Sequence, residues 1–518
     1  MKQRGKYAIA LTAALGLFMA VLDNTVVNVT LTPMAKSFNA SLSSIGWVVT
    51  GYFLAQAAVI PVAGYFSERV GIKRLFMVCL SFFTAGSLLC GLAQNENMLI
   101  AFRVLQGLGG GALFPLSQAI AFGAFAPSER PAASGIIGVP VLLAPAFGPT
   151  VGGLINDNFG WAYIFFINVP VGILAVFLAW RIIPADKPRE RSEGARFDVL
   201  GLALSILGVL AIVYAFTLVS QTQPGTETAL NPRGTIYGWG YWPVWALVAA
   251  GAVLLVAFAV YELRSDDPVL DLRLYKKSEF LLGSMVTWTV SAAVFGSLIL
   301  IPIFLEQVRQ PHLSALDAGL TLMPQGIAAA IAVTFSSRLF NRLGVRTLVL
   351  VGGAFLVISS WQLTQLTATT DGFGLMPWLI LRGFGFGLAG IPAQTLAMQK
   401  ITGRALPRAS SLFTVTRQIF SSVGVAVVTT IFVQQTLQHA TDLRAALPKL
   451  PPGVAPDPNN PAFAAAQERL AAQAGAAGAS DVFVLVTIGT LLIVLLALAL
   501  PGRQPATAPP ERSLAVAE

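Results

Sequence analysis

Long apolar runs separated by short polar segments recur along the whole chain. The hydrocarbon core of a bilayer is about 30 Å thick, and a helix needs roughly 20 predominantly apolar residues to cross it. Fourteen runs of this kind begin near Tyr7, Ile45, Leu75, Met98, Ala133, Ala162, Phe197, Tyr241, Phe280, Ala315, Thr347, Gly374, Ser410 and Asp481. The pattern predicts an all-α polytopic membrane protein with 14 transmembrane helices.

The positive charges are distributed unevenly between the two sides that these spans define. On one side lie 24 of the 33 Lys and Arg residues, whereas the short loops of the other side hold only Lys36, Arg233 and Arg309. Because Lys and Arg near span ends are retained in the cytoplasm, we expect both termini to be cytoplasmic. The first apolar run is longer than the core of a signal peptide and lacks a cleavage pattern, so we expect it to remain as a helix.

Composition agrees with a lipid-embedded chain. Hydrophobic residues make up 55% of the sequence and charged residues 11%, against roughly 25% charged in ordinary soluble domains. The net charge of +9 is spread over the loops, which favours anionic membrane lipids over nucleic acid as neighbours. Cys79 and Cys90 lie in one span about 16 Å apart, too far for a disulfide.

The chain carries an internal repeat. The second and tenth spans end in related motifs that align Gly71 with Gly344. Further along, each half has an arginine followed by several glycines, Arg103 in one and Arg382 in the other. Matched features in two six-span halves are typical of secondary transporters, whose substrate site lies between the halves.

The repeat and the composition define the expected domains. Residues 1–184 form the first six-helix bundle, and 185–278 hold cytoplasmic linkers around an inserted seventh and eighth helix. Residues 279–503 form the second bundle, with an extracytoplasmic loop over 434–480 that is Pro-rich and then Ala-rich. Prolines argue against helix there and alanines favour a short surface helix. The function of this loop stays open between a surface flap, an element that docks a partner and a gating element. The tail 504–518 is expected to be disordered.

Four charged residues interrupt the apolar runs: Asp23, Arg103, Arg382 and Arg417. A charge at bilayer depth costs at least about 2.5 kcal/mol, so such residues usually face a cavity or a partner. Asp23 is the one acid clearly at depth. Desolvation disfavours its ionised form, so it could take up a proton from one side and release it to the other. The alternatives are a counter-ion for a cationic substrate and a structural carboxylate held by Arg103.

Arg103 keeps its charge at all relevant pH values, so we expect it to bias the protonation of a nearby acid and to orient Gln106, one turn further on. A structural arginine is the alternative. The fifth span combines helix-interrupting prolines with glycines that permit close contact, which predicts a kinked, tightly packed helix. Whether it acts as a hinge or a passive kink is open. These residues are Pro145, Gly148, Pro149, Gly152 and Gly153.

Polar and aromatic residues on the first two spans could line a mixed cavity. Asn24 and Asn28 share one helical face, and Trp47, Tyr52 and Gln56 follow in the second span. Aromatic residues in spans also serve as interfacial anchors. With Gln106, these side chains are the candidate substrate contacts.

Motifs for catalysis are absent from the sequence. His312 and His439 have no acids at metal-ligand spacing, and neither a phosphate-binding loop nor a nucleophile motif occurs. We therefore expect no enzyme, no metal, no cofactor and no ATP-driven transport.

These features resemble the fourteen-helix drug/proton antiporter branch of the major facilitator superfamily, of the EmrB/QacA type. Residues 22–29 are similar to its first-helix signature, 64–74 to its motif between the second and third helices, and Arg103 with Gln106 to its fourth-helix motif. Residues 148–153 are similar to the fifth-helix motif that marks exporters. The resemblance extends over nearly the whole chain and implies the major facilitator fold, two six-helix bundles plus two inserted helices.

The resemblance assigns conformational gating to the loop motif and the fifth span. The loop motif contributes Gly64, Glu68, Arg69, Gly71 and Arg74. This chain departs from the usual pattern, with Glu68 in place of Asp, Ile72 at the first basic position and Ala144 at the leading glycine of the fifth-helix motif.

The function implied is proton-coupled export of amphipathic or cationic small molecules, that is multidrug efflux and antibiotic resistance, by alternating access. Because Asp23 is the one acid at depth, monovalent or neutral lipophilic substrates are favoured over dications. Export of a lipid or an endogenous metabolite is the alternative, and a non-transporting membrane sensor is a third reading. We expect a monomer in a bacterial inner or plasma membrane, with an accessory envelope protein left open as a partner.

Overall fold

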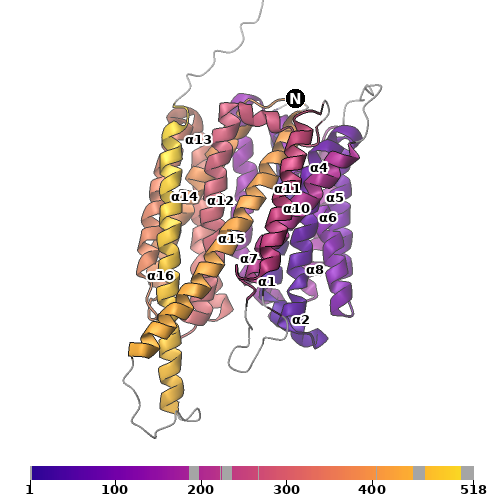
Figure 1. Ribbon diagram of the computed structural model, residues 1–518. Helices are drawn as coiled ribbons and strands as arrows, with labels where there is room; N and C mark the ends of the chain where they lie inside the picture. Colours follow the sequence, from indigo (N-terminus) through magenta and orange to yellow (C-terminus); the bar gives the residue numbers. More distant parts are fainter. Residues whose placement is uncertain are drawn as a thin grey trace, which may run out of the picture.

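The computed structural model describes residues 3–185, 198–221, 223, 236–265, 268–403, 405–446 and 461–502. In these ranges the chain is a bundle of long helices (Figure 1), thirteen of which are long and apolar enough to cross a membrane. One of them, α13 (Ala315–Gln362), bends at Gly344, where φ is 81°, and comprises two spans. The fourteen spans predicted from the sequence are therefore present.

The first half of the chain supplies six spans and some short connecting helices. The spans are α1 (Gln3–Val29), α4 (Trp47–Val70), α5 (Ile72–Gly91), α6 (Glu96–Ala124), α7 (Arg130–Phe159) and α9 (Asn168–Ile182), which α8 (Tyr163–Phe166) precedes. The connecting helices are α2 (Leu31–Phe38), α3 (Leu42–Ile45) and η1 (Pro127–Glu129).

The inserted pair and the second half follow. The pair is α10 (Val199–Ser220) and α11 (Trp242–Glu262), and η2 (Leu272–Lys276) leads into the second half. That half consists of α12 (Ser278–Ile303) with the turn η3 (Phe304–Val308), α13, η4 (Leu363–Gln365), α14 (Gly372–Gln399), α15 (Ala405–Ala446) and α16 (Pro461–Ala499).

Local sequence signals explain several helix boundaries. The side chain of Asn95 accepts a hydrogen bond from the Met98 N–H at 2.9 Å and so caps α6. Asp198 caps α10 in the same way through Gly201. Such caps satisfy backbone donors that the first helical turn leaves without a partner. Gly71, between α4 and α5, has φ of 98° and ψ of 141°. The conformation resembles that of Gly344, which agrees with the aligned repeat.

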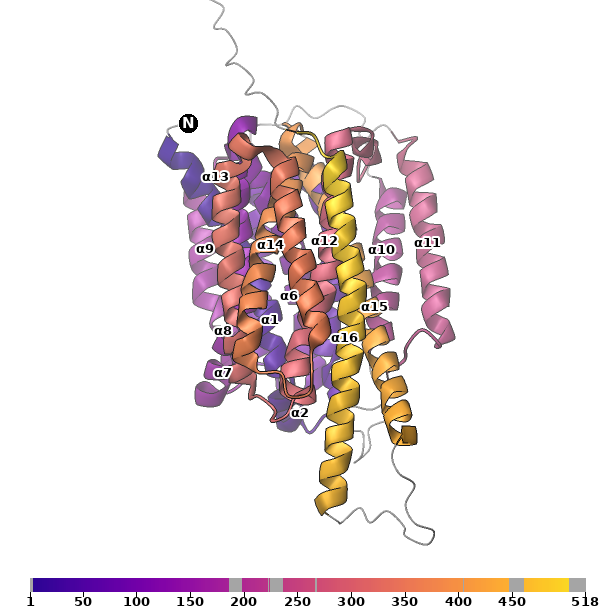
Figure 2. The ribbon, with the colours of Figure 1, turned by 90° about the vertical axis from the view of Figure 1, so that its left-hand side faces the viewer.

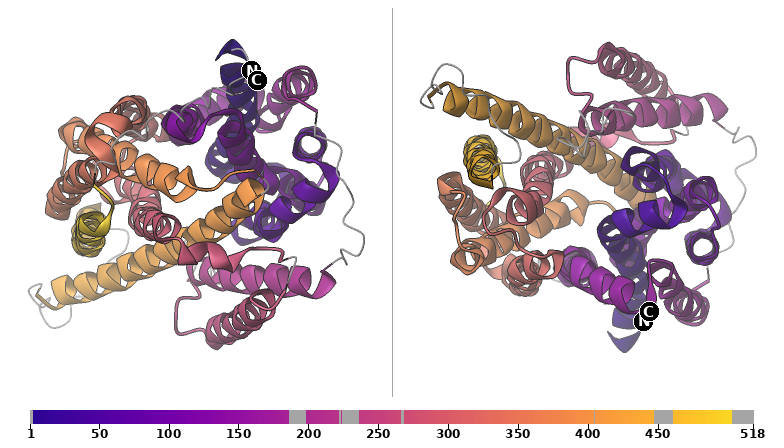
Figure 3. Two further views of the ribbon diagram at one scale, coloured as in Figure 1. Left: turned by 90° about the horizontal axis from the view of Figure 1, so that it is seen from above. Right: turned by 90° about the horizontal axis from the view of Figure 1, so that it is seen from below.

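The two halves lie side by side, and the inserted pair covers the seam between them (Figure 3). α7 packs against α13 and α14, and α15 packs against α4 and α6. α10 contacts both α4 and α15, whereas α11 packs mainly on α10. The inserted helices are thus peripheral, and the contact between the halves is formed by α4, α6, α7, α13, α14 and α15.

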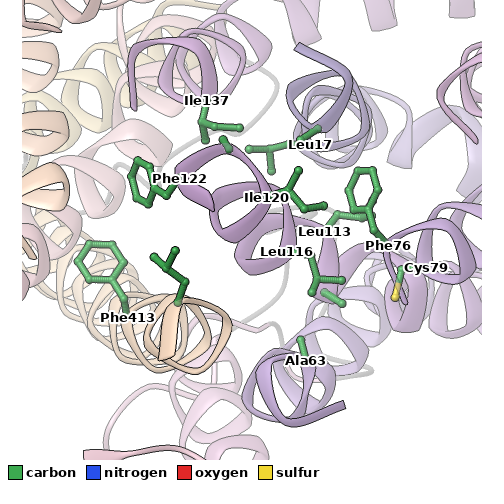
Figure 4. Close-up of a cluster of buried hydrophobic side chains, with 14 of the residues drawn as sticks. Leu17, Ala63, Phe76, Cys79, Leu113, Leu116, Ile120, Phe122, Ile137 and Phe413 are labelled. Atoms are coloured by element: carbon green, nitrogen blue, oxygen red, sulfur yellow. The ribbon is translucent and has the colours of Figure 1, made fainter. Parts of the chain in front are cut away.

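The largest buried apolar cluster centres on α6 (Figure 4), with side chains such as Leu113 and Leu116 between α1, α4 and α5. Phe413 of α15 belongs to the same cluster, so the core continues from the first half into the second. In lipid this packing gains van der Waals contact rather than hydrophobic free energy, which makes close fit between helices important.

The predicted extracytoplasmic loop is more helical than its sequence suggests. The segment 434–480 is helical on both sides of residues 447–460, since α15 continues to Ala446 and α16 begins at Pro461. Both helices project beyond the other spans (Figure 2). The Ala-rich stretch is therefore an extension of the last span rather than a separate surface helix, because alanine propagates a helix and no proline follows Pro461 within α16 to interrupt it. The linker 186–197, the prolines between 447 and 460 and the tail 504–518 lie outside the described residues.

Candidate functional site

The carboxylate of Asp23 lies at the centre of a buried polar cluster within the first half. Asp23 is 2% exposed. Its Oδ2 is 2.6 Å from the guanidinium of Arg103, and its Oδ1 accepts hydrogen bonds from Gln106 at 3.0 Å and from Asn168 at 2.9 Å. The one acid that the sequence placed at depth is therefore paired with the arginine predicted to act beside it.

The Arg103 side chain is fixed by hydrogen bonds and by an aromatic ring in addition to its ion pair with Asp23. Its Nε donates to the carbonyl of Val48 at 3.2 Å, and its guanidinium also donates to Gln106 Oε1 at 2.8 Å. The ring centre of Tyr52 lies 4.0 Å from the guanidinium carbon, a cation–π contact. Since both charges are buried, removing one partner alone leaves an uncompensated charge, at about 3–5 kcal/mol in comparable pairs.

Asn168 and Ser87 complete this cluster, and sequence reasoning assigned neither of them to it. The Asn168 amide also donates to Ser87 Oγ at 3.1 Å, and that hydroxyl donates to the Phe165 carbonyl at 2.9 Å. Asp23, Ser87, Arg103 and Asn168 come from α1, α5, α6 and α9. The available signal was a polar residue inside the apolar run of each of these helices.

The fifth span, α7, packs tightly against α1 just beyond Asp23. A Cβ at Gly148 would overlap the Thr25 hydroxyl, and a Cβ at Gly152 would lie 3.0 Å from the Val26 carbonyl. Thr25 Oγ1 also lies 3.3 Å from the Ala144 carbonyl, to which it donates. The predicted close contact is present, and only a residue without a side chain fits at Gly148.

The opposite side of α7 faces the second half. Gly326 of α13 leaves room for Ala146, and the hydroxyls of Ser134 and Thr395 are hydrogen-bonded at 2.6 Å. α7 therefore touches both the helix that carries Asp23 and the second half of the molecule. Pro145 and Pro149 lie within this continuous helix, and Gly153 has open space beside it.

The loop motif at the end of α4 also contacts the second half. Glu68 forms a two-pronged ion pair with Arg408 of α15, with nitrogen to oxygen distances of 2.7 and 2.9 Å. A Cβ at Gly64 would lie 2.8 Å from the Arg408 Cα, so the backbones of α4 and α15 nearly touch. Arg69 stacks on the ring of Tyr65 at 4.3 Å, whereas Arg74 is exposed.

Arg130 adds a further contact at the same end of the molecule, where it donates to the carbonyls of Met398 and Gln399. With Glu68 and Ser134, these contacts join the halves at the face on which the chain begins. Sequence reasoning placed Glu68 in a gate, but it could not name the partners because they lie in the other half.

A small cavity of about 30 Å³ lies between the halves, lined by residues of α6, α7, α12, α14 and α15. None of the six predicted substrate contacts is among its lining residues in this conformation. Tyr52 and Gln106 are fully buried in the Asp23 cluster, and Trp47 lies 6.0 Å from the Tyr214 ring of α10. Asn24, Gln56 and the exposed Asn28 lie elsewhere on α1 and α4, so their role in binding stays a prediction.

The other two arginines at depth differ from Arg103. Arg382 is fully buried and donates to the hydroxyls of Ser360 and Ser297. Arg417 lines the cavity and stacks on the ring of Phe114 at 4.1 Å. Among the described residues, neither of the two has a carboxylate within ion-pair distance.

Comparison with known proteins supports the same class of protein. The family model of the Major Facilitator Superfamily matches residues 13–425. The Escherichia coli multidrug export protein EmrB is 32% identical over 445 residues, which cover 85% of this chain and 83% of that protein. The Neisseria gonorrhoeae fatty acid resistance protein FarB is 31% identical over 435 residues, 84% of this chain and 82% of that protein.

A solved structure shares the fold at low sequence identity. The crystal structure of the human organic anion transporter MFSD10 superposes with a TM-score of 0.60 and 14% identity, covering 94% of this chain and 99% of that one. At this identity the likeness concerns the arrangement of helices alone.

Proposed function

Because this chain belongs to the major facilitator superfamily, we propose that it is a proton-coupled secondary transporter that exports amphipathic or cationic small molecules by alternating access. It is a multi-pass protein of the cell membrane, and its relatives include bacterial multidrug exporters. Its cargo is a small molecule, and it is a transporter rather than an enzyme. The proposal concerns the driving ion, the direction and the class of cargo.

The buried pair of Asp23 and Arg103 is the observation that carries the proposal. Asp23 is the carboxylate at depth, and Arg103 holds it in place at 2.6 Å. Binding of a proton would neutralise the carboxylate and weaken its attraction for the guanidinium, so the pair can exist in two arrangements. Two such arrangements, each open to a different side, are what coupling requires.

α7 offers a route from that pair to the rest of the molecule. It fits against α1 at Gly148 and Gly152, close to Asp23, and against α13 at Ala146. A shift of α1 on proton binding would therefore move α7 and change the contact between the halves. We propose that the contacts of Glu68 and Arg130 at the end of the bundle open when the halves rock, and that this end is cytoplasmic as the loop charges indicate.

The energy available is sufficient for export. When the cargo is uncharged, one proton moving down a membrane potential of about 100 mV releases about 2.3 kcal/mol. At about 1.4 kcal/mol per tenfold change, this sustains a cargo gradient of nearly fiftyfold.

Export of a lipid-like compound is the second candidate. The relative named for fatty acid resistance supports it, since 84% of this chain aligns with that protein at 31% identity. A panel that contains lipids as well as drug-like cations distinguishes the two kinds of cargo. A sensor that transports nothing is distinguished from both because it would move no protons.

The test replaces the carboxylate by an amide. Purified protein is reconstituted with an imposed pH gradient, and proton flux is followed by trapped pyranine while ethidium serves as the cargo probe. For Asp23→Asn we expect coupled proton flux to fall at least tenfold, while downhill movement of ethidium continues. Asp371→Asn, which changes an exposed acid of the same type, should behave as the wild type.

Loss of the carboxylate leaves Arg103 buried without its partner, and the single variant could fail to fold for that reason. The double variant Asp23→Asn/Arg103→Gln removes both charges and keeps hydrogen-bonding groups. It should fold and equilibrate ethidium without proton movement. Uphill export with unchanged pH dependence in either variant would refute the proposal.

A further inference from the structure

The cavity between the halves carries one charged side chain. It is about 30 Å³ in volume, room for no more than one or two water molecules in this conformation. Its walls come from both halves, with Phe114, Val141 and Leu142 on one side and Phe295 and Phe386 on the other. Separation of the halves would therefore enlarge it, in keeping with a site that admits cargo in another state.

Arg417 is that charged residue. It lies 12 residues after the start of α15, about 18 Å along the helix and so at mid-membrane depth. Its guanidinium carbon lies 4.1 Å from the ring centre of Phe114, a residue of the other half. No described residue accepts a hydrogen bond from it or pairs with it as a carboxylate. A guanidinium in this position is costly unless it has a ligand, which makes it a functional candidate.

Two glutamine side chains lie at the cavity or within one helical turn of its lining. Gln394, 5% exposed, lines the cavity. Gln118, one helical turn beyond Phe114 on α6, is fully buried, and neither polar atom of its side chain is satisfied. Buried amides without partners are uncommon in proteins. Gln394 thus places an amide on the cavity wall, and the unsatisfied amide of Gln118 lies one helical turn from Phe114.

The balance of charge in the interior is positive. Asp23 is neutralised by Arg103, and Arg382 is held by serine hydroxyls. Among the described residues that line the cavity none is acidic, so Arg417 makes the electrostatic potential there positive. A cavity walled by apolar side chains strengthens that field, because little solvent is present to screen it.

We propose that this cavity binds an amphipathic organic anion, with the anionic group on the guanidinium of Arg417 and the apolar body among the aromatic and aliphatic walls. The planar guanidinium suits a carboxylate or sulfonate, which it binds through two parallel hydrogen bonds. The Gln394 amide lies within the same lining and can donate to the same group. This inference rests on the proposed export function and assigns the cargo to amphipathic anions in place of cations.

The link to transport follows from the position of Arg417. Its stacking partner Phe114 belongs to the first half and Arg417 to the second. An anion bound between them bridges both halves, so its affinity depends on how far apart they stand. Cargo that binds more tightly in one arrangement shifts the population towards it.

The test compares two probes that share an apolar body and carry head groups of opposite charge. These are 2-(1-naphthyl)ethanesulfonate and the corresponding trimethylammonium compound, both permanently charged and tritiated. Binding to the full-length protein in detergent is measured by scintillation proximity. We expect the wild type to prefer the sulfonate at least tenfold. Arg417→Gln should weaken sulfonate binding by about tenfold to hundredfold, since a charged hydrogen-bond donor is lost.

Two further variants separate charge recognition from loss of structure. Arg417→Lys keeps the charge without the planar fork, so its sulfonate affinity should lie between those of the wild type and Arg417→Gln. Arg382→Gln removes a buried guanidinium that does not line the cavity, and the ratio of the two affinities should stay unchanged. Equal or tighter binding of the ammonium probe, or a change below twofold in Arg417→Gln, overturns the proposal.

The same protein in liposomes distinguishes this inference from the proposed function. Movement of the ammonium probe that depends on the pH gradient and ignores Arg417→Gln would keep proton-coupled export and overturn the anion site. Sulfonate binding that needs Arg417, in a protein whose cargo movement ignores the pH gradient, would keep the anion site and overturn proton coupling.

Discussion

At the scale of single residues, the Asp23 cluster shows how a buried carboxylate in a membrane span is supplied with hydrogen-bond donors from neighbouring helices. Arg103, Gln106 and Asn168 all donate to it, and each comes from a helix other than its own. Hydrogen bonds to charged groups are roughly twice as strong as neutral ones. The cluster therefore ties α1 to α6 and α9.

Replacement of Asn168 by leucine tests the stabilising part of that role. The variant removes a donor from the carboxylate and one from Ser87, so we expect the free energy of unfolding to fall by about 1–3 kcal/mol. Thermal unfolding in detergent measures the change. Asn158→Leu alters an exposed asparagine that donates to the Leu154 carbonyl, and its midpoint should stay close to that of the wild type. Equal midpoints for all three proteins would contradict the assignment.

The charged members of this cluster could be predicted from sequence, and the neutral ones could not. Asp23 and Arg103 stand out because a charge inside an apolar run is expensive and rare. Asn168 and Ser87 are small polar residues of a kind that occurs in many spans. Their importance comes from meeting one carboxylate in three dimensions, which no spacing along the chain reveals.

At the scale of helices, α7 connects the Asp23 region to the second half through contacts that need small residues. Gly148 meets Thr25 of α1, and Gly326 of α13 meets Ala146. The prolines that predicted a kink lie in a helix that runs without a break from Arg130 to Phe159.

Gly148→Ala is expected to lower transport and stability together. The added methyl group would overlap the Thr25 hydroxyl, and overpacking of this kind costs about 1–3 kcal/mol. Gly153→Ala is the matched control, because a Cβ there meets no atom within 4 Å. It should leave transport intact and raise stability slightly through higher helix propensity. Transport assays and thermal unfolding on both variants give the comparison, and similar behaviour of the two would refute the packing argument.

Span positions were predicted well because a 20-residue apolar run has one stable form in lipid, a helix with its backbone bonded internally. The predicted start of the last helix was wrong by about 20 residues. The apolar run begins near Asp481, whereas α16 begins at Pro461. Hydropathy marks where a helix enters the hydrocarbon and carries no information on how far it continues outside.

At the scale of the whole molecule, the two halves are joined at one end by Glu68 and Arg408 and by Arg130 with the end of α14. The sequence predicts the duplication from Gly71 and Gly344, which share a positive φ. It does not predict which residues meet across the seam. The Ser134–Thr395 pair is 261 positions apart, and its geometry depends on the complete fold.

Charge exchange tests whether the Glu68–Arg408 pair stabilises the closed end. Glu68→Arg or Arg408→Glu alone places like charges together at a partly buried site, so we expect transport to fall at least tenfold. The double variant restores an opposite pair and should recover a large part of the activity. Transport in liposomes and labelling of a cysteine near this end report on activity and closure. Failure of the double variant to improve on both single variants, with normal folding, would contradict the idea.

The projecting helix α16 has a practical consequence. Its 39 residues extend about 58 Å, whereas the hydrocarbon core spans about 30 Å, so one end stands clear of the lipid (Figure 2). Side chains 465–469 near that end are exposed. A helical epitope grafted there would bind an antibody fragment in one fixed orientation relative to the transmembrane helices. Such a fiducial would let electron microscopy align particles that otherwise show only a smooth detergent belt.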